Sequence, residues 1–219
     1  MKVQQNGPIW ILDLGDDENT LSPTILNTLE ATMEDVVASN EPAALMTVGS
    51  GKLYSNGLDL DWLGENPSEF DAYLARVQTM LARLLTLPVP TVAAISGHAF
   101  GAGAMLALAH DYRVMRTERG YFCLPEIDLH VPFTDGLARL VTAKLGTLTA
   151  FDLMTTGRRY DAESAEDAGI TNGTAPIETL VTAAASHVEY LADKDRVTMS
   201  AIKKSIFTVA YDALGGHSD

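Results

Sequence analysis

Short apolar segments alternate with longer amphipathic segments along the first half of the chain, and this alternation limits the fold more than any other feature. The short segments resemble buried parallel strands, and the longer ones repeat apolar residues at helical spacing. Alternation with short connections predicts an α/β fold with a parallel sheet. Strands are expected at Ile9–Leu14, Ala43–Val48, Thr91–Ile95 and Tyr112–Arg116, and helices at residues 23–39, 70–84 and 102–109.

Strand signals become rare after Phe133. A short strand is expected within residues 169–174, and helices are expected at Leu180–Ala192 and Val197–Ala213. This change of pattern predicts an α/β core over residues 1–175, followed by a helical C-terminal segment over residues 176–219.

The composition excludes several classes of function. The net charge is −14 and no run of lysine and arginine is present, which argues against binding of nucleic acid. The single cysteine, Cys123, allows no intramolecular disulfide and is expected to be a buried thiol. The chain has no apolar segment typical of a signal peptide or a membrane span and ends without a peroxisomal tripeptide, so we expect a cytoplasmic protein that does not enter membranes.

Two glycine-rich loops each follow an expected strand. Gly97, Gly101 and Gly103 form the spacing G-x-x-x-G-x-G, which matches neither the dinucleotide fingerprint nor the P-loop. The other loop, Gly51–Leu63, contains Gly57. Each loop alone could be only a tight turn. Together, two such loops on neighbouring strands can aim one backbone N–H each at a common point, as in an oxyanion hole.

A third segment, Pro125-Glu126-Ile127, places a carboxylate in a mostly apolar stretch. Burial there would raise the pKa of Glu126 toward neutrality, as a general acid/base requires. A lone glutamate is otherwise usually a surface residue. His110 and Asp111 are not expected to belong to a hydrolytic triad, because no Gly-x-Ser-x-Gly motif is present. Asp111 is instead expected to bond backbone groups at the end of a helix.

The motifs SNGLDL, SGHAFGAGAMLALAHDYRVM and PEI occur in this order, and with them the chain resembles the enoyl-CoA hydratase/isomerase (crotonase) superfamily from Ile9 to about residue 175. Within it, the motifs are most similar to those of the plant-type enoyl-CoA delta isomerases. The resemblance implies the crotonase (ClpP/crotonase-like) fold of repeated β-β-α units. It also implies a homotrimer or a dimer of trimers, although little helix is expected after Ala213 for packing between the subunits of a trimer.

The resemblance assigns roles to three residues. The backbone N–H groups of Leu58 and Ala102 would form the oxyanion hole, and Glu126 would be the catalytic glutamate. Ala102 departs from the family's glycine, but its N–H is retained. Hydratases of the family carry a second glutamate at the position of Met105. A single carboxylate suffices to move a proton between two carbons, so Met105 favours isomerisation and a drier pocket.

The expected activity is therefore isomerisation of a 3-enoyl-CoA to the trans-2-enoyl-CoA. Another crotonase-type reaction (hydration, decarboxylation or thioester hydrolysis) is the enzymatic alternative, and a non-catalytic acyl-CoA-binding protein is the alternative of another class. If a second carboxylate exists, Asp128 and Asp135 are the candidates.

The acyl-CoA thioester would be the substrate, and no further cofactor or metal is expected. His130, His187 and His217 lack metal-ligand spacing, and His98 is expected to be a hydrogen-bonded structural residue. Walls of the acyl pocket could be formed by Trp62, Tyr73 and Phe133. The phosphates of coenzyme A could be bound by Lys52, Lys203 and Lys204. The remaining residues expected to line the substrate site are Leu53, Ser55, Asp59, Leu60, His98, Gly101, Met105 and Pro125.

Overall fold

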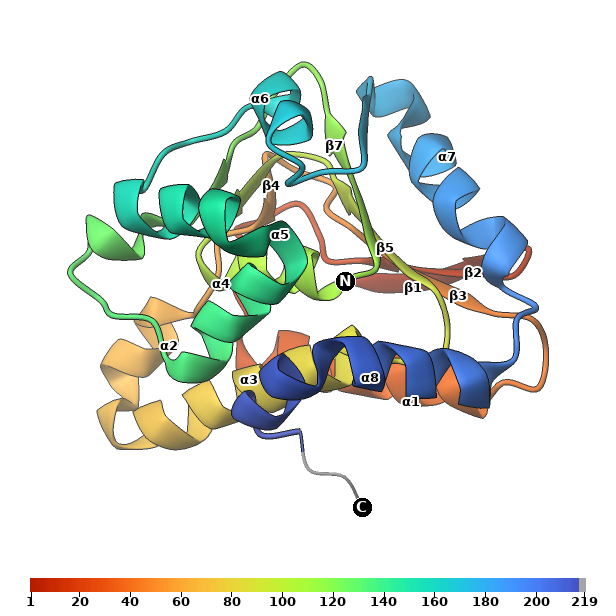
Figure 1. The fold of residues 1–219 in the computed structure, drawn as a ribbon, viewed down its shortest axis with the longest axis horizontal. Coiled ribbons are helices and arrows are strands. Elements are labelled where there is room, and N and C mark those ends of the chain that lie inside the picture. Colours follow the sequence, from red (N-terminus) through yellow and green to blue (C-terminus); the bar gives the residue numbers. More distant parts are fainter. Residues whose placement is uncertain (217–219) are drawn as a thin grey trace.

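The computed structural model describes residues 1–216 and contains a six-stranded sheet at its centre (Figure 1). The strand order is β1-β2-β3-β5-β7-β9, and all neighbours are parallel except β1 and β2. The sheet is therefore mixed at its edge, where a wholly parallel one was predicted. The strands are β1 (Lys2–Asn6), β2 (Ile9–Asp13), β3 (Ala44–Val48), β5 (Thr91–Ile95), β7 (Tyr112–Arg116) and β9 (Gly173–Ala175).

Three very short strands form a second sheet in the order β4-β6-β8. They are β4 (Leu53–Ser55), β6 (His98–Phe100) and β8 (Phe122–Cys123). Each follows a strand of the main sheet and precedes a helix: α2 (Leu60–Glu65), α4 (Ala102–Ala109) and the 3-10 turn η2 (Pro125–Ile127). The predicted β-β-α repeat is therefore present, and the small sheet brings the three connecting loops to one place.

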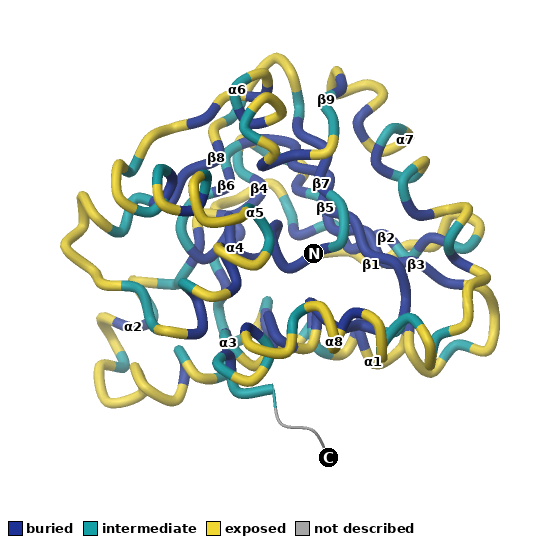
Figure 2. The backbone as a smooth tube through the Cα atoms, in the orientation of Figure 1, coloured by how far each residue is buried: buried dark blue, intermediate teal, exposed yellow. Residues whose placement is uncertain are grey.

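The side chains of the main sheet alternate between two buried clusters. On one face, Leu12, Leu45 and Ile95 pack with α1 (Pro23–Ala38), α3 (Phe70–Leu85), α4 and α5 (Asp135–Thr156). On the other face, Met46 and Val92 pack with α7 (Ile177–Val188). Figure 2 shows the central strands and the inward sides of these helices as mostly buried, whereas the edge strand β1 is exposed. The sheet thus lies between helices, as α/β folds require.

Most of the predicted helices are confirmed. Ser22 caps α1 by accepting a hydrogen bond from Ile25 N, and Pro23 is the first helical residue. The helix α5 was not predicted. Its buried residues are mixed with fully exposed apolar ones such as Leu148, and it bends at Gly146, which has φ +71°. Its pattern is therefore neither one-sided nor continuous, and periodicity alone does not reveal it.

The C-terminal half of the chain adds α6 (Ala162–Asp167), α7 and α8 (Arg196–Ala213), with 3-10 turns at η1 (Pro67–Glu69) and η3 (Glu189–Leu191). The helix α8 lies along α5 and α3 (Figure 1). The strand β9 ends at Ala175, and the division into a core and a C-terminal segment at this residue stays a prediction. Within residues 1–216, no helix is long and apolar enough to cross a membrane.

Candidate active site

The first glycine loop (Gly51–Leu63) and the second, which contains Gly97, Gly101 and Gly103, lie against each other. Gly57 has φ +92°, and a β carbon on it would come within 2.9 Å of Phe100 O and 3.0 Å of Ala102 N. A side chain at position 57 would therefore push the second loop away. The backbone of Gly57, the residue before Leu58, therefore lies close to that of Ala102.

The glycine spacing of the second loop has a structural explanation. A β carbon on Gly97 would collide with Lys52 O, and one on Gly103 would collide with Ser55 O. These two glycines let the backbones of the first and second loops touch. Only Gly101 borders the third segment: it has φ +51°, and its β carbon would lie 3.4 Å from Glu126 Oε1. Gly97 and Gly103 therefore serve contact between the two loops, and Gly101 is the glycine of this loop that faces Glu126.

Leu58 N and Ala102 N have no hydrogen-bond acceptor among residues 1–216. Ala102 opens α4, so its N–H is one of the groups that a helix leaves without an internal partner. The positive end of the helix dipole adds to this donor. Two free donors on touching loops are what an oxyanion hole requires.

Tyr73 fixes the first loop in this position. Its hydroxyl accepts a hydrogen bond from Asp59 N (2.9 Å) and donates one to Leu21 O (2.9 Å). Leu21 N in turn donates to Gly57 O (2.7 Å). Tyr73 was expected as a wall of the acyl pocket, but its ring is buried and its hydroxyl holds the residues on both sides of Leu58.

A second anchor is Asn19, which is buried and has φ +52°. Its side-chain amide donates to Gly15 O, Leu53 O and Tyr54 O, and its backbone carbonyl accepts from Ser55 Oγ (2.7 Å). Ser55 also accepts from Gly57 N (3.3 Å). Ser55, expected to line the substrate site, is thus engaged within the loop. Nothing in the sequence signals Asn19, an asparagine in an acidic turn.

Glu126 sits in the 3-10 turn η2, which Pro125 begins. Its side chain is largely buried, and Oε2 has no hydrogen-bond partner among residues 1–216. Burial raises the pKa of Glu126 to about 7, which confirms the predicted direction. The neutral and ionised forms are then both well populated near neutral pH, so the group can donate and accept a proton.

His98 differs from expectation. Its ring lies near those of Phe100 and Tyr121, with centroids 5.1 and 5.6 Å away, and its Nδ1 is buried without a hydrogen-bond partner. The prediction that His98 is hydrogen-bonded is therefore wrong for its Nδ1 atom. Burial, followed by the charges of Arg119 and Arg159, lowers the pKa of His98. The neutral ring is held in place by aromatic packing.

The other residues expected at the site have varied surroundings. Met105 is buried in the main core, while Leu53 is half-buried in β4. Asp59 caps α2 by accepting from Trp62 N, and Leu60 is 65% exposed. Trp62 packs on the Tyr73 ring with a centroid distance of 5.4 Å. Phe133 packs against the main core from a half-buried position.

The three lysines expected to bind the phosphates of coenzyme A differ in burial. Lys203 is buried, and its ammonium donates to Leu87 O, Val89 O and Asp111 Oδ2, so it cannot hold a phosphate at the surface. Lys52 and Lys204 are exposed. Asp111 accepts from Thr91 N (2.8 Å), so it bonds the backbone as expected, but at the first residue of β5 and not at the end of a helix.

The two alternative carboxylates lie outside the buried part of the site. Asp128 and Asp135 are both exposed, and Asp135 pairs with Arg139 across one turn of α5. Cys123 is buried, as predicted. Among the described residues no group of three histidine, cysteine or acidic side chains could hold a metal ion, and His217 lies outside them.

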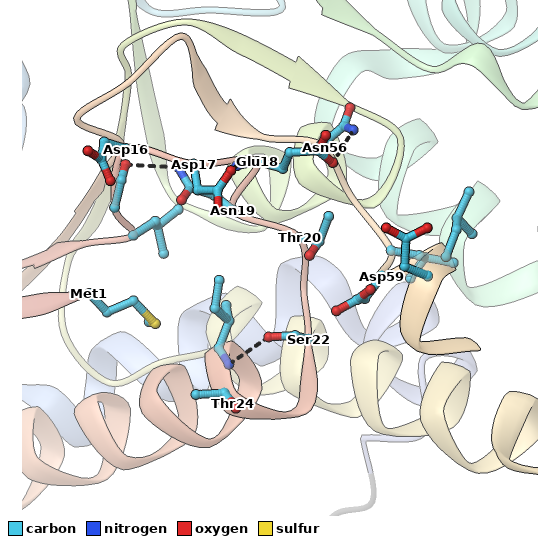
Figure 3. A pocket seen from close by; sticks show the side chains of 16 residues that line it. Met1, Asp16, Asp17, Glu18, Asn19, Thr20, Ser22, Thr24, Asn56 and Asp59 are labelled. Carbon is cyan, nitrogen blue, oxygen red and sulfur yellow. Dashed lines mark hydrogen bonds between the residues drawn. The ribbon is translucent and has the colours of Figure 1, made fainter. Parts of the chain in front are cut away.

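A cavity of about 860 Å³ adjoins the first loop. Figure 3 shows it between the turn at Asp16–Thr20 and the residues Asn56 and Asp59, and Leu58 and Leu60 also line it. Glu126 and Ala102 are not among its lining residues. The touching loops and Glu126, and not this acidic cavity, therefore define the candidate active site.

The family model described as enoyl-CoA hydratase/isomerase matches residues 7–215. The chain belongs to this family. It is 35% identical to enoyl-CoA delta isomerase 3 of Arabidopsis thaliana, over 94% of this chain and 91% of that protein. It is 29% identical to the mitochondrial enoyl-CoA hydratase of Pongo abelii, over 94% of this chain and 71% of that protein.

The fold matches solved structures of the same kind. Human mitochondrial delta3-delta2-enoyl-CoA isomerase superposes with a TM-score of 0.88 at 22% identity, over 98% of this chain and 85% of that one. A probable enoyl-CoA hydratase of Mycobacterium tuberculosis superposes with a TM-score of 0.89, also at 22% identity, over 98% and 91%. The architecture is thus the predicted crotonase fold.

Proposed function

We propose that this protein isomerises a 3-enoyl-CoA to the trans-2-enoyl-CoA. The observation that carries the proposal is one buried carboxyl, Glu126, with a pKa of about 7 beside the Gly101–Ala102 turn. The relatives named as delta isomerases support the same reaction. A single acid/base is enough for it, because one proton leaves C2 and one proton enters C4.

In the proposed mechanism, the thioester oxygen accepts hydrogen bonds from Leu58 N–H and Ala102 N–H. The Glu126 carboxylate takes a proton from C2, and the electron pair of that C–H bond passes into a dienolate whose negative charge rests on the thioester oxygen. The two N–H donors stabilise this charge. Protonated Glu126 then returns the proton to C4, which leaves the double bond between C2 and C3 and restores the carboxylate.

The proposed reaction needs no metal and no cofactor beyond the coenzyme A of the substrate. Met105 is buried in the core. A thioether at this position favours isomerisation over hydration, because it cannot activate a water molecule. Decarboxylation and thioester hydrolysis use the same enolate or oxyanion chemistry, and a non-catalytic binding protein would use the same pocket. All of these are outcomes of the experiment below.

The test is a side-by-side assay of the purified protein with 3-hexenoyl-CoA and 2-hexenoyl-CoA. We expect isomerisation to exceed hydration by about 10²–10⁴-fold, the usual effect of one member of an acid/base pair. Glu126→Gln should remove isomerisation and leave acyl-CoA affinity nearly unchanged. Equal rates of hydration and isomerisation would overturn the assignment.

Asp128→Asn and Asp135→Asn are the matched controls, because each removes an exposed carboxylate close to Glu126 in sequence. Both should keep wild-type turnover. Loss of turnover in either control, together with activity in Glu126→Gln, would assign the proton transfer to a different residue. Binding of acyl-CoA with no turnover of either substrate would indicate a binding protein.

We also propose a homotrimer or a dimer of trimers. On α5, Leu148 and Phe151 are 87% and 68% exposed, which is unusual for large apolar side chains so close together on one helix. Light scattering after size exclusion would give the mass. Phe151→Ser should shift it toward the monomer if this face takes part in assembly, and an unchanged trimer would exclude that face.

A further inference from the structure

A second cavity, of about 640 Å³, lies on the side of α8 and within the size range of small-molecule sites. Met199, Ile202, Ile206 and Phe207 of α8 line it, together with Pro90 and Tyr112. Ile202 and Ile206 are 54% and 65% exposed. None of the residues assigned above to the proton transfer or the oxyanion hole lines this groove.

Three lysines line the groove, and two of them, Lys144 and Lys203, have ammonium groups that donate hydrogen bonds. The ammonium of Lys203 is saturated by its three acceptors. The ammonium of Lys144 donates to His110 O (2.8 Å) and has no further acceptor among residues 1–216. Phe207 lies under it, with its ring centroid 4.9 Å from Lys144 Nζ. Lys144 therefore keeps N–H donors for a ligand in an environment that is partly apolar.

Positive charge is in excess at this end of the groove. Lys144 is repelled by the charges of Arg113 and Lys203, and Asp111 is the carboxylate that interacts with all three. Burial, and then repulsion from Arg113, lower the pKa of Lys144 to about 7. Asp195 at the rim is exposed and bonds Thr198 N, while Lys194 is also exposed. An anion beside Lys144 would restore its charge and offset the repulsion.

We propose that this groove binds an aliphatic carboxylate, with the carboxylate on Lys144 and the hydrocarbon chain along the apolar side of α8. Lys144 suits the carboxylate of such a ligand, and the apolar residues of α8 suit its hydrocarbon chain. A carboxylate gains a charge-assisted hydrogen bond from the Lys144 ammonium, whose one acceptor among residues 1–216 is His110 O. A hydrocarbon chain removes Ile202, Ile206 and Phe207 from water. A small inorganic anion would satisfy only the first half.

The experiment is a calorimetric titration of the full chain at pH 6.5 with decanoate, decanol and decyltrimethylammonium. These probes share a ten-carbon chain and differ in charge. Decanoate should bind about tenfold more tightly than decanol, as expected for one charge-assisted hydrogen bond, and decyltrimethylammonium should bind more weakly than either. Equal affinity for decanoate and decanol would overturn the proposal.

Lys144→Met should weaken decanoate binding about tenfold and leave decanol binding within about twofold. The matched control is Lys194→Met, which removes an exposed lysine of the same groove and should change either affinity less than about twofold. If Lys144→Met does not fold, Ile206→Glu on the exposed side of α8 replaces it and should weaken decanoate several-fold by repulsion. Decanoate binding that none of these variants affects would lie elsewhere, for example at Glu126, and would refute the proposal.

Discussion

The two ends of α4 are built in opposite ways. At the N-terminal end, Ala102 N and the neighbouring Glu126 Oε2 have no hydrogen-bond partner among residues 1–216. At the C-terminal end, His110 O accepts hydrogen bonds from both Arg113 (3.1 Å) and Lys144 (2.8 Å). The helix is eight residues long, and its polar groups are left open at one end and paired at the other.

The paired end continues as a network through the core. His110 Nδ1 lies 2.9 Å from Leu106 O, and Nε2 lies 3.0 Å from Thr47 Oγ1, which in turn bonds Tyr54 in the first loop. Burial lowers the pKa of His110 to about 3, so the ring is neutral. Cations at the negative end of the helix dipole also favour this arrangement. The comparison indicates that one end of α4 stabilises the fold, while the other is available for chemistry.

Asp111→Ala should have the largest effect on stability. It leaves the buried ammonium of Lys203 without its charge partner, which typically costs about 3–5 kcal/mol of unfolding free energy. Turnover per folded molecule should stay close to that of the wild type. Urea denaturation measures the first quantity and the isomerase assay the second. The control Asp111→Asn keeps an oxygen acceptor and should lose less stability, and a large loss of turnover would mean that the two ends are not separate.

Ala102→Pro tests the other end directly, because proline removes the backbone N–H. Position 102 is the first residue of α4, where proline is tolerated. Turnover should fall about 10²–10³-fold, as for the loss of one oxyanion donor, with little change in melting temperature. Ala102→Gly keeps the N–H and should remain active. Normal turnover of the proline variant would exclude Ala102 N as a donor.

The stability of Glu126→Gln should depend on pH. In the wild type the pKa of Glu126 is raised to about 7 in the folded state, so between pH 4.5 and 7 folding retains a proton that the unfolded chain releases. The wild type therefore loses stability as the pH rises, and the glutamine variant does not. At pH 8 the variant should be more stable by roughly 2–3 kcal/mol. At pH 4 the two should agree, and equal stability at both values would contradict the raised pKa.

Tyr73→Phe should have the smallest effect on stability and turnover. It removes the hydroxyl that links the first loop to Leu21. Removing the hydroxyl leaves Asp59 N and Leu21 O without this partner and should cost about 1–3 kcal/mol. The value of kcat/KM should fall about tenfold because Leu58 loses its fixed position. The control Tyr121→Phe alters an exposed tyrosine and should change neither value. Unchanged kcat/KM in Tyr73→Phe would show that Leu58 is positioned by other contacts.

Much of the fold can be predicted from the sequence, because strands and helices in α/β proteins repeat apolar residues at characteristic periods. The strands β3, β5 and β7 and the helices α1, α3 and α4 follow from such local patterns. The strands β4, β6 and β8 have two or three residues each, too few to show a period. They form only because the loops that contain them lie side by side in the folded chain.

The same distinction applies to the site. The sequence by itself determined the chemistry available: one glutamate in an apolar stretch, glycines in two loops, and methionine at position 105. Only the tertiary structure decided that Gly97 and Gly103 serve contact between loops, that Asn19 and Tyr73 hold the first loop, and that Lys203 is buried on Asp111. Residue type and local period are encoded along the chain. Burial, pairing and proximity depend on residues far apart in sequence, and these set the pKa of Glu126 and leave its neighbouring N–H groups free.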